Sequence, residues 1–273
     1  MRTPILITIL VALAVTAVIV IAGGLIVDPN RPLILEAAFS ADTLTPNADG
    51  QGDVAVFSYA LARDARVSIT LTDASGQVYT FRDAQATPQG EYSITFSGIV
   101  EGYTLPDEDI IGMVERRLLP DGVYTWTLDA IGLTREEQMS TNGTLTIRES
   151  DAALPLMTDF TVSPSVFTPN QDGVADIVFI NVFLQKPAEL IAYLLSDSGE
   201  RVYIAPRQDI RKEGEAGWQE FTYEGGVDIG SEPPPDGDYR LFVEAQDAEG
   251  QRIVIESALT IQNGGKPRAG ILG

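Results

Sequence analysis

The sequence predicts an all-β protein in which one N-terminal transmembrane helix is followed by two tandem antiparallel β-sandwiches. Three observations support this prediction. A long uncharged apolar run lies near the N-terminus, short runs of alternating apolar and polar residues follow it, and a group of motifs occurs twice in the same order. Alternation with a period of two is typical of strands that bury one face.

The apolar run extends from Pro4 to Val27, between Arg2 and Asp28. A helix of this length crosses the core of a bilayer. A cleaved secretory signal is the competing interpretation, but its apolar region spans only about 7–15 residues and needs a small-residue cleavage site. We therefore expect residues 1–32 to form an uncleaved single-pass membrane anchor and a short spacer. Because Arg2 precedes the run, we expect a cytoplasmic N-terminus and an extracytoplasmic bulk.

Two stretches that lie 123 residues apart, 45–53 and 168–176, are nearly the same. In both copies a turn with Val-Tyr and then Pro-Asp-Gly-x-Tyr follow, the last ending at Tyr124 and Tyr239. The chain is therefore an internal duplication, and its length suits two domains of roughly 100–150 residues each. The predicted segments after the anchor are a first sandwich at 33–150, a second sandwich at 151–263 and a flexible tail at 264–273.

The composition excludes several classes of function. The chain has no Cys and no His, so disulfides, Cys nucleophiles and His-based acid–base pairs are absent. Its net charge is −21, spread evenly: 18 acids against 7 bases in residues 35–150, and 20 against 9 in residues 151–273. An evenly negative surface repels phosphate backbones, so we expect no nucleic acid partner. Motifs of hydrolases and nucleotide-binding enzymes are also missing, and we expect no enzymatic activity.

The motif Asn-x-Asp-Gly-x-x-Asp occurs once in each copy. Oxygen-bearing side chains at alternate positions, followed by a Gly, suit a Ca²⁺ site, although the Glu that closes an EF-hand loop is missing. The same residues also describe a turn in which Asn and Asp side chains accept hydrogen bonds from nearby amides. Both interpretations stay open. The turn needs no cofactor, whereas the calcium interpretation takes as ligands Asn47, Asp49, Asp53, Asn170, Asp172 and Asp176.

The first copy contains an insert. Tyr79 to Pro120 is nine residues longer than Tyr203 to Pro235. Acidic residues followed by apolar ones predict a short helix near 105–119. This helix either plugs the open end of its own domain or presents an apolar face to another protein. In the second case the partner-contacting residues are Ile110, Ile111, Met113, Val114 and Leu118.

The order of the repeated motifs resembles that of bacterial Ig-like domains of the flagellar hook-capping and gliding-associated C-terminal type. The resemblance covers about residues 36–148 and 157–262, and it is more specific for fold than for function. It implies Ig-like sandwiches that serve attachment, spacing or assembly outside the membrane, and it supplies no catalytic residues.

We therefore expect a membrane-anchored, extracytoplasmic, non-catalytic scaffold that bridges partners at the cell envelope. The alternative is an accessory structural subunit of a larger membrane protein complex. A third hypothesis is carbohydrate binding by a sandwich, which exposed aromatic side chains such as Trp218, Tyr103 or Tyr223 would indicate. A glycosidase built on carboxylates alone would need a cleft that small sandwiches rarely form.

The two interpretations of the Asn-x-Asp-Gly loops give different melting temperatures in the presence of a chelator. If the loops are turns alone, as we expect, chelation leaves the Tm of the full-length protein unchanged. A bound ion would stabilise the folded state, so its removal would lower the Tm. A decrease that disappears in the double variant Asp49→Ala with Asp172→Ala would establish calcium binding.

Overall fold

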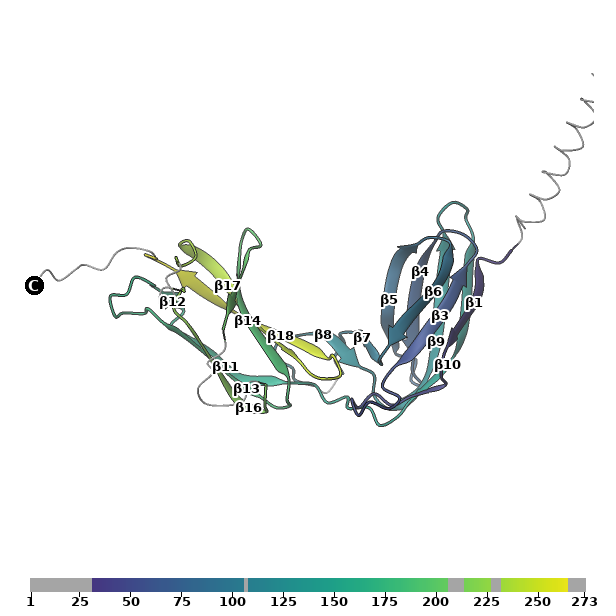
Figure 1. Ribbon diagram of the computed structural model, residues 1–273, viewed down its shortest axis with the longest axis horizontal. Helices are drawn as coiled ribbons and strands as arrows, with labels where there is room; N and C mark the ends of the chain where they lie inside the picture. The colour runs from purple at the N-terminus through teal and green to yellow at the C-terminus, as the bar shows by residue number, and fades with distance from the viewer. Residues whose placement is uncertain (1–30, 106–107, 206–213, 227–231, 265–273) are drawn as a thin grey trace, which may run out of the picture.

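The computed structural model describes residues 31–105, 108–205, 214–226 and 232–264. These residues form strands and turns, with no helix among them, and fold into two sandwiches placed one after the other along the long axis (Figure 1). The prediction of an all-β fold built from β-sandwiches is thereby confirmed for the described residues. The predicted anchor and nearly all of the predicted tail lie outside the described residues. Within the described ranges, no helix has the length and apolarity needed to cross a membrane.

The first sandwich packs a three-stranded sheet, β1–β3–β6, against a five-stranded sheet, β2–β10–β9–β4–β5. Alternate side chains point inward, so Val67, Ile69 and Leu71 of β4 are fully buried in the core between the sheets. The strands are β1 Ile34–Phe39, β2 Thr43–Leu44, β3 Ala55–Leu61, β4 Ala65–Thr72, β5 Val78–Thr87, β6 Gly90–Phe96, β9 Gly122–Gly132 and β10 Gln138–Ile147.

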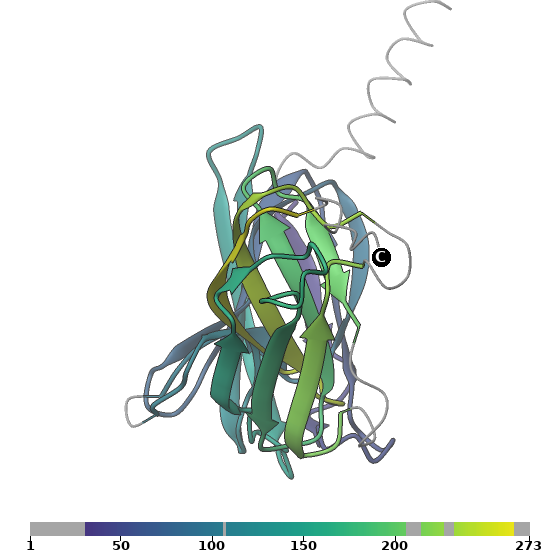
Figure 2. The ribbon, with the colours of Figure 1, turned by 90° about the vertical axis from the view of Figure 1, so that its left-hand side faces the viewer.

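The second sandwich repeats this plan, with the three-stranded sheet β11–β13–β16 packed against strands β15–β14–β17–β18. Figure 2, viewed from the end that carries this domain, shows its strands in front. Its core holds the inward side chains of both sheets, among them Ile180, Leu241 and Val243. The strands are β11 Met157–Ser163, β12 Val166–Phe167, β13 Val178–Leu184, β14 Glu189–Ser196, β15 Arg201–Ile204, β16 Gly217–Tyr223, β17 Gly237–Gln246 and β18 Arg252–Ile261.

Two features recur in both copies. A short strand makes a parallel pair, β2 with β10 and β12 with β18, so the predicted purely antiparallel pattern holds for all but these pairs. The tyrosine of each Pro-Asp-Gly-x-Tyr motif is buried and donates its hydroxyl back to a proline carbonyl, Tyr124 to Pro120 and Tyr239 to Pro235, each at 2.8 Å. This resembles the tyrosine corner of Ig-type sandwiches, which fixes the start of a core strand.

The insert in the first copy is not a helix, so the prediction of a helix near 105–119 was wrong. Its residues Met113–Leu118 form strand β8, which pairs antiparallel with β7, Ile99–Glu101, just before the insert. Strand β8 then pairs antiparallel with β18 of the second domain, which extends that sheet to the order β15–β14–β17–β18–β8–β7. The acidic residue Glu108 forms a two-point ion pair with the buried Arg117 at 2.5 Å instead of beginning a helix.

The predicted partner-contacting residues divide into two groups. Ile110 and Val114 pack against the core of the second domain, and Leu118 is fully buried. Ile111 and Met113 stay exposed, at 57% and 58%. The apolar face of the insert therefore contacts the neighbouring domain of the same chain.

Strands β7 and β8 together form an arm of the first domain, and this arm requires a glycine where it approaches β18. Gly112 has a φ of +95°, and a Cβ atom at this position would lie 2.4 Å from the carbonyl oxygen of Val254. A side chain would thus both strain the backbone and separate the two domains. The arm fits against the second sandwich only because this residue has no side chain.

A buried polar network closes the joint beneath the paired strands. Gln251 is fully buried; it accepts a hydrogen bond from the amide of Leu118 at 3.3 Å and donates to the carbonyl of Ala153 at 2.8 Å. Lys186 forms ion pairs with Asp247 at 2.8 Å and with two further carboxylates, those of Asp151 and Glu249. Although burial alone would lower the pKa of Lys186, its hydrogen bonds to these three carboxylates raise it. The segment between the domains is therefore held in place by side chains of the second domain.

Gln251→Ala should destabilise the protein strongly. The substitution leaves buried backbone groups of both domains without a partner, which costs about 2–4 kcal/mol when several such groups are involved. The free energy of unfolding of the full-length protein, measured by urea denaturation, should fall by this amount. The matched control is Gln262→Ala, at an exposed glutamine of the same domain. Equal stabilities for the two variants would contradict the role assigned to Gln251.

Candidate functional site

The two Asn-x-Asp-Gly loops have the same hydrogen bonds in both copies. In the first, the carboxylate of Asp53 accepts hydrogen bonds from the amides of Asn47, Ala48 and Gly50, at 3.1, 2.8 and 2.7 Å. The side chain of Asp49 accepts one bond, from the amide of Gln51. Asp176 and Asp172 make the equivalent bonds in the second copy.

These contacts support the turn interpretation. Both oxygens of Asp53 and of Asp176 face backbone N–H groups, which favour a negative charge and oppose a cation at the same place. In the described part of the chain no group of three or more acidic side chains is placed to hold a metal ion. The calcium interpretation stays a prediction for the chelation experiment.

The three aromatic residues singled out from the sequence lie in different environments. Tyr223 is buried in the second core. Tyr103 is half-buried at the joint, where the guanidinium of Arg117 covers its ring at 4.7 Å. Trp218 is 45% exposed and meets the ring of Phe183 edge-on at 5.6 Å. They therefore form no common surface.

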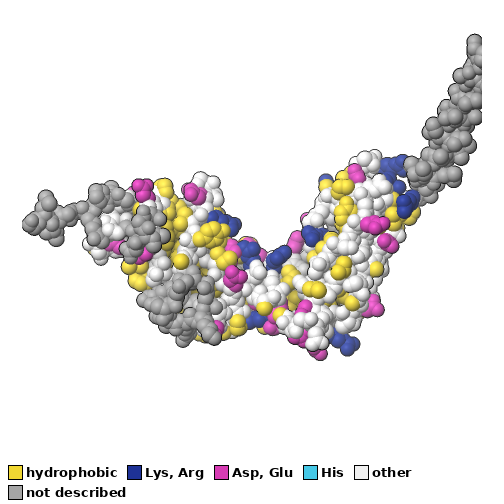
Figure 3. All heavy atoms as spheres, in the orientation of Figure 1, with side chains coloured by type: hydrophobic (Ala, Val, Ile, Leu, Met, Phe, Trp, Pro, Cys, Tyr) yellow, Lys and Arg dark blue, Asp and Glu magenta, His cyan; other side chains and the backbone are white. Residues whose placement is uncertain are grey.

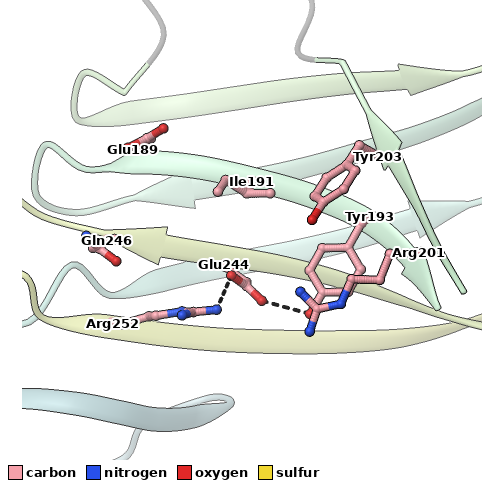
Figure 4. Close-up of a pocket in the computed structure, with 8 residues that line it drawn as sticks. All are labelled: Glu189, Ile191, Tyr193, Arg201, Tyr203, Glu244, Gln246 and Arg252. Carbon is pink, nitrogen blue, oxygen red and sulfur yellow. Dashed lines mark hydrogen bonds and ion pairs between the residues drawn. The ribbon is translucent and has the colours of Figure 1, made fainter. Parts of the chain in front are cut away.

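A groove lies on the outer face of the large sheet of the second domain, across β14, β15, β17 and β18 (Figure 4). Its volume is about 250 Å³. The residues that line it are Glu189, Ile191, Tyr193, Arg201, Tyr203, Glu244, Gln246 and Arg252.

Aromatic rings form one end of this groove. Tyr203 lies opposite Tyr193 on the neighbouring strand, with ring centroids 5.9 Å apart, and Tyr193 stacks on Phe242 at 5.2 Å. The guanidinium of Arg201 lies over the ring of Tyr193, 4.6 Å from its centroid. Tyr203 is 64% exposed, whereas Tyr193 is buried. The outermost ring thus faces solvent on a rigid aromatic support.

A buried carboxylate fixes the floor of the groove. Glu244 is 7% exposed; it accepts a hydrogen bond from the hydroxyl of Tyr193 at 2.7 Å and forms an ion pair with Arg252. Arg252 also forms an ion pair with Glu115, which belongs to the arm of the first domain, at 3.2 Å. Burial, together with the hydrogen bond to Glu244, raises the pKa of Tyr193 to about 12. The groove is therefore preorganised, and its polar network continues into the joint between the domains.

The exposure of Tyr203 arises from one additional residue. Both turns that precede the Val-Tyr pair are closed by matching backbone hydrogen bonds, which align Gly76 with Gly199. Tyr79 follows Gly76 by three residues, whereas Tyr203 follows Gly199 by four. Because a shift of one residue moves a strand side chain to the other face, Tyr79 is buried and Tyr203 is exposed.

The neighbouring strands differ between the copies in the same place. Thr70 lies opposite Thr127 in the first domain, and Tyr193 lies opposite Phe242 in the second. The two pairs are equivalent, since Thr127 and Phe242 each follow the tyrosine of the corner by three residues. The duplicated fold therefore carries threonines at this place in one copy and an aromatic, charged groove in the other.

This groove was not predicted from the sequence. The two Val-Tyr pairs look equivalent there, and no residue of β14, β15 or β17 belongs to a motif that indicates a site. The signal was the extra residue, Arg201, between Gly199 and the second Val-Tyr pair. The sequence alone does not show whether this extra residue exposes Val202 or Tyr203. The register of the turn decides this, and only the structure gives that register.

Comparison with known proteins assigns no family to the chain. No family model matches it. No curated protein matches it either. The resemblance to the hook-capping and gliding-associated Ig-like type thus stays a prediction.

Solved structures similar to the chain include a tandem repeat of a large adhesion protein, a dimeric latent protein and a bacterial ice-binding adhesin. The tetra-tandem repeat of the extending region of a large adhesion protein is 20% identical, with a TM-score of 0.28, and the match covers 84% of this chain and 49% of that one. Dimeric latent PorU from Porphyromonas gingivalis is 13% identical, with a TM-score of 0.30, and the match covers 86% of this chain and 20% of PorU. The solved chain of a 1.5-MDa bacterial ice-binding adhesin is 13% identical, with a TM-score of 0.24, and the match covers 83% of this chain and 64% of that one. The description of the fold therefore rests on the strand pairings of this chain.

Asp53→Ala should destabilise the first domain by about 1–2 kcal/mol, because three amides lose a charged acceptor at an exposed loop where water replaces it in part. Asp49→Ala removes one such bond and should cost less. Urea denaturation of both variants tests the turn interpretation. Equal losses for Asp49→Ala and Asp53→Ala would contradict it.

Proposed function

We propose that the protein is a membrane-anchored, extracytoplasmic scaffold with a binding rather than a catalytic role, which holds partners at a fixed distance from the membrane. The single observation that carries this proposal is the pairing of β8 with β18. Tandem domains joined by a flexible linker set a range of distances, whereas domains that share a sheet set one distance.

The charge and the anchor support the same role. The net charge of −21 keeps such a module soluble and separate from other acidic surfaces. The segment Pro4 to Val27 has the length and apolarity for a single crossing, and Arg2 favours a cytoplasmic N-terminus. A rigid two-domain unit that is fixed to the membrane at one end is suited to bridging envelope proteins.

The location of the protein provides the test. With an epitope tag at the C-terminus, the full-length protein should sediment with membranes, and the tag should be accessible to antibody on intact or outer-membrane-permeabilised cells. Leu13→Arg with Val18→Arg should release it from the membrane, because a charge at the centre of a span costs about 2.5–3.5 kcal/mol. The matched control Leu13→Ile with Val18→Ile should stay in the membrane.

A tag that is reached only after lysis of the inner membrane would contradict the proposal.

Gentle detergent extraction then distinguishes the two forms of the proposal, the free-standing scaffold and the accessory subunit. Recovery of the protein alone supports a free-standing scaffold, whereas recovery with membrane proteins in a fixed ratio supports an accessory subunit of a larger complex.

A further inference from the structure

The groove on the second sandwich has the chemistry of a binding site for an uncharged ligand. Its two acidic residues, Glu189 and Glu244, are balanced by Arg201 and Arg252. A neutral groove in a chain with a net charge of −21 is a local exception. On the face of the molecule seen in Figure 3, acidic and basic side chains likewise mix where the two sandwiches meet. Such balance favours neither phosphate groups nor cations.

The shape and lining of the groove further restrict the class of ligand that it can bind. Glu189 and Gln246 lie opposite each other at the end away from Tyr203 (Figure 4). Tyr193 follows Glu189 by four positions on β14, a distance of about 13 Å at about 3.3 Å per residue. One end therefore offers an exposed aromatic face, and the other offers a carboxylate acceptor and an amide that both donates and accepts.

We propose that this groove binds a neutral oligosaccharide. A sugar ring has an apolar C–H face, which packs on the exposed ring of Tyr203, and a rim of hydroxyl groups. The hydroxyls both donate and accept hydrogen bonds, as Gln246, Glu189 and the guanidinium of Arg201 require. The length of the groove suits more than one sugar ring.

The preorganisation of the groove supports binding at low entropic cost. Tyr193, Glu244 and Arg252 are fixed by their mutual contacts, so a ligand need not order them. The first domain has threonines in the equivalent place, which offer no aromatic face. The second domain is thus the ligand-binding copy, and the first carries it away from the membrane.

This inference deepens the proposed function and rests on it, since it names what the scaffold holds. The test uses the full-length protein in a zwitterionic detergent that has no sugar head group. Isothermal titration calorimetry measures binding of four neutral hexasaccharides: cellohexaose, laminarihexaose, maltohexaose and chitohexaose. At least one should bind, and a neutral hexapeptide should not.

Variants of the exposed ring then locate the site. Tyr203→Ala should weaken sugar binding by about tenfold, equivalent to about 1.4 kcal/mol, and Tyr203→Phe should keep binding within about threefold because the ring remains. The matched control is Trp218→Ala, which removes an exposed aromatic side chain from the other sheet of the same domain and should leave binding unchanged. Unchanged melting temperatures confirm that the variants are folded.

Three results would overturn the proposal: binding of none of the four sugars, tighter binding of the peptide, or an equal loss of binding in Trp218→Ala and Tyr203→Ala. None of them would alter the membrane location of the protein. Failure of the sugar site is therefore distinguishable from failure of the proposed function.

Discussion

The arrangement of the molecule depends on the pairing of β8 with β18. A strand of the first domain covers an edge of the second that would otherwise expose unpaired amides and carbonyls. The pairing places Arg116 opposite Arg252, a contact between like charges that alone would be unfavourable. Glu115 and Glu244 both form ion pairs with Arg252, which offsets the repulsion. The acids that stabilise the joint also fix the groove, so the domain contact and the candidate site depend on one another.

The duplication shows which features the fold requires and which it leaves free. Each copy has a carboxylate that accepts hydrogen bonds from three loop amides. Each also has a tyrosine whose hydroxyl donates a hydrogen bond to a proline carbonyl. Both contacts fix the position at which a strand enters the core. Outward-facing positions have no such requirement. The first copy has an insert that contributes β8, and the second has one more residue, Arg201, before its Val-Tyr pair, where Tyr203 lies at the surface. One difference lies at the connection between the domains, and the other lies at the groove.

Much of the fold could be predicted from the sequence, because strand alternation and turn residues are local signals. Val67, Ile69 and Leu71 alternate with polar residues, and they lie in the core as expected. The prediction of a helix in the insert was wrong because the structure of this segment depends on a partner that is distant in the sequence. Acids before apolar residues are a local sign of a helix, but Met113–Leu118 pairs with a strand more than 130 residues later in the chain, and no local pattern reports that partner. The groove was missed because its residues come from four strands and its exposed ring depends on the register of one turn.

The pairing of β8 with β18 should hold the two domains as one rigid unit, and the distance between the domains reports this rigidity. The chain has no Cys, so Glu91→Cys and Glu220→Cys, at exposed positions in the first and second sandwiches, would carry the only two spin labels. Double electron–electron resonance on the full-length protein should give a single narrow distribution of distances between the labels. A broad distribution, such as that of domains joined by a flexible linker, would contradict the account.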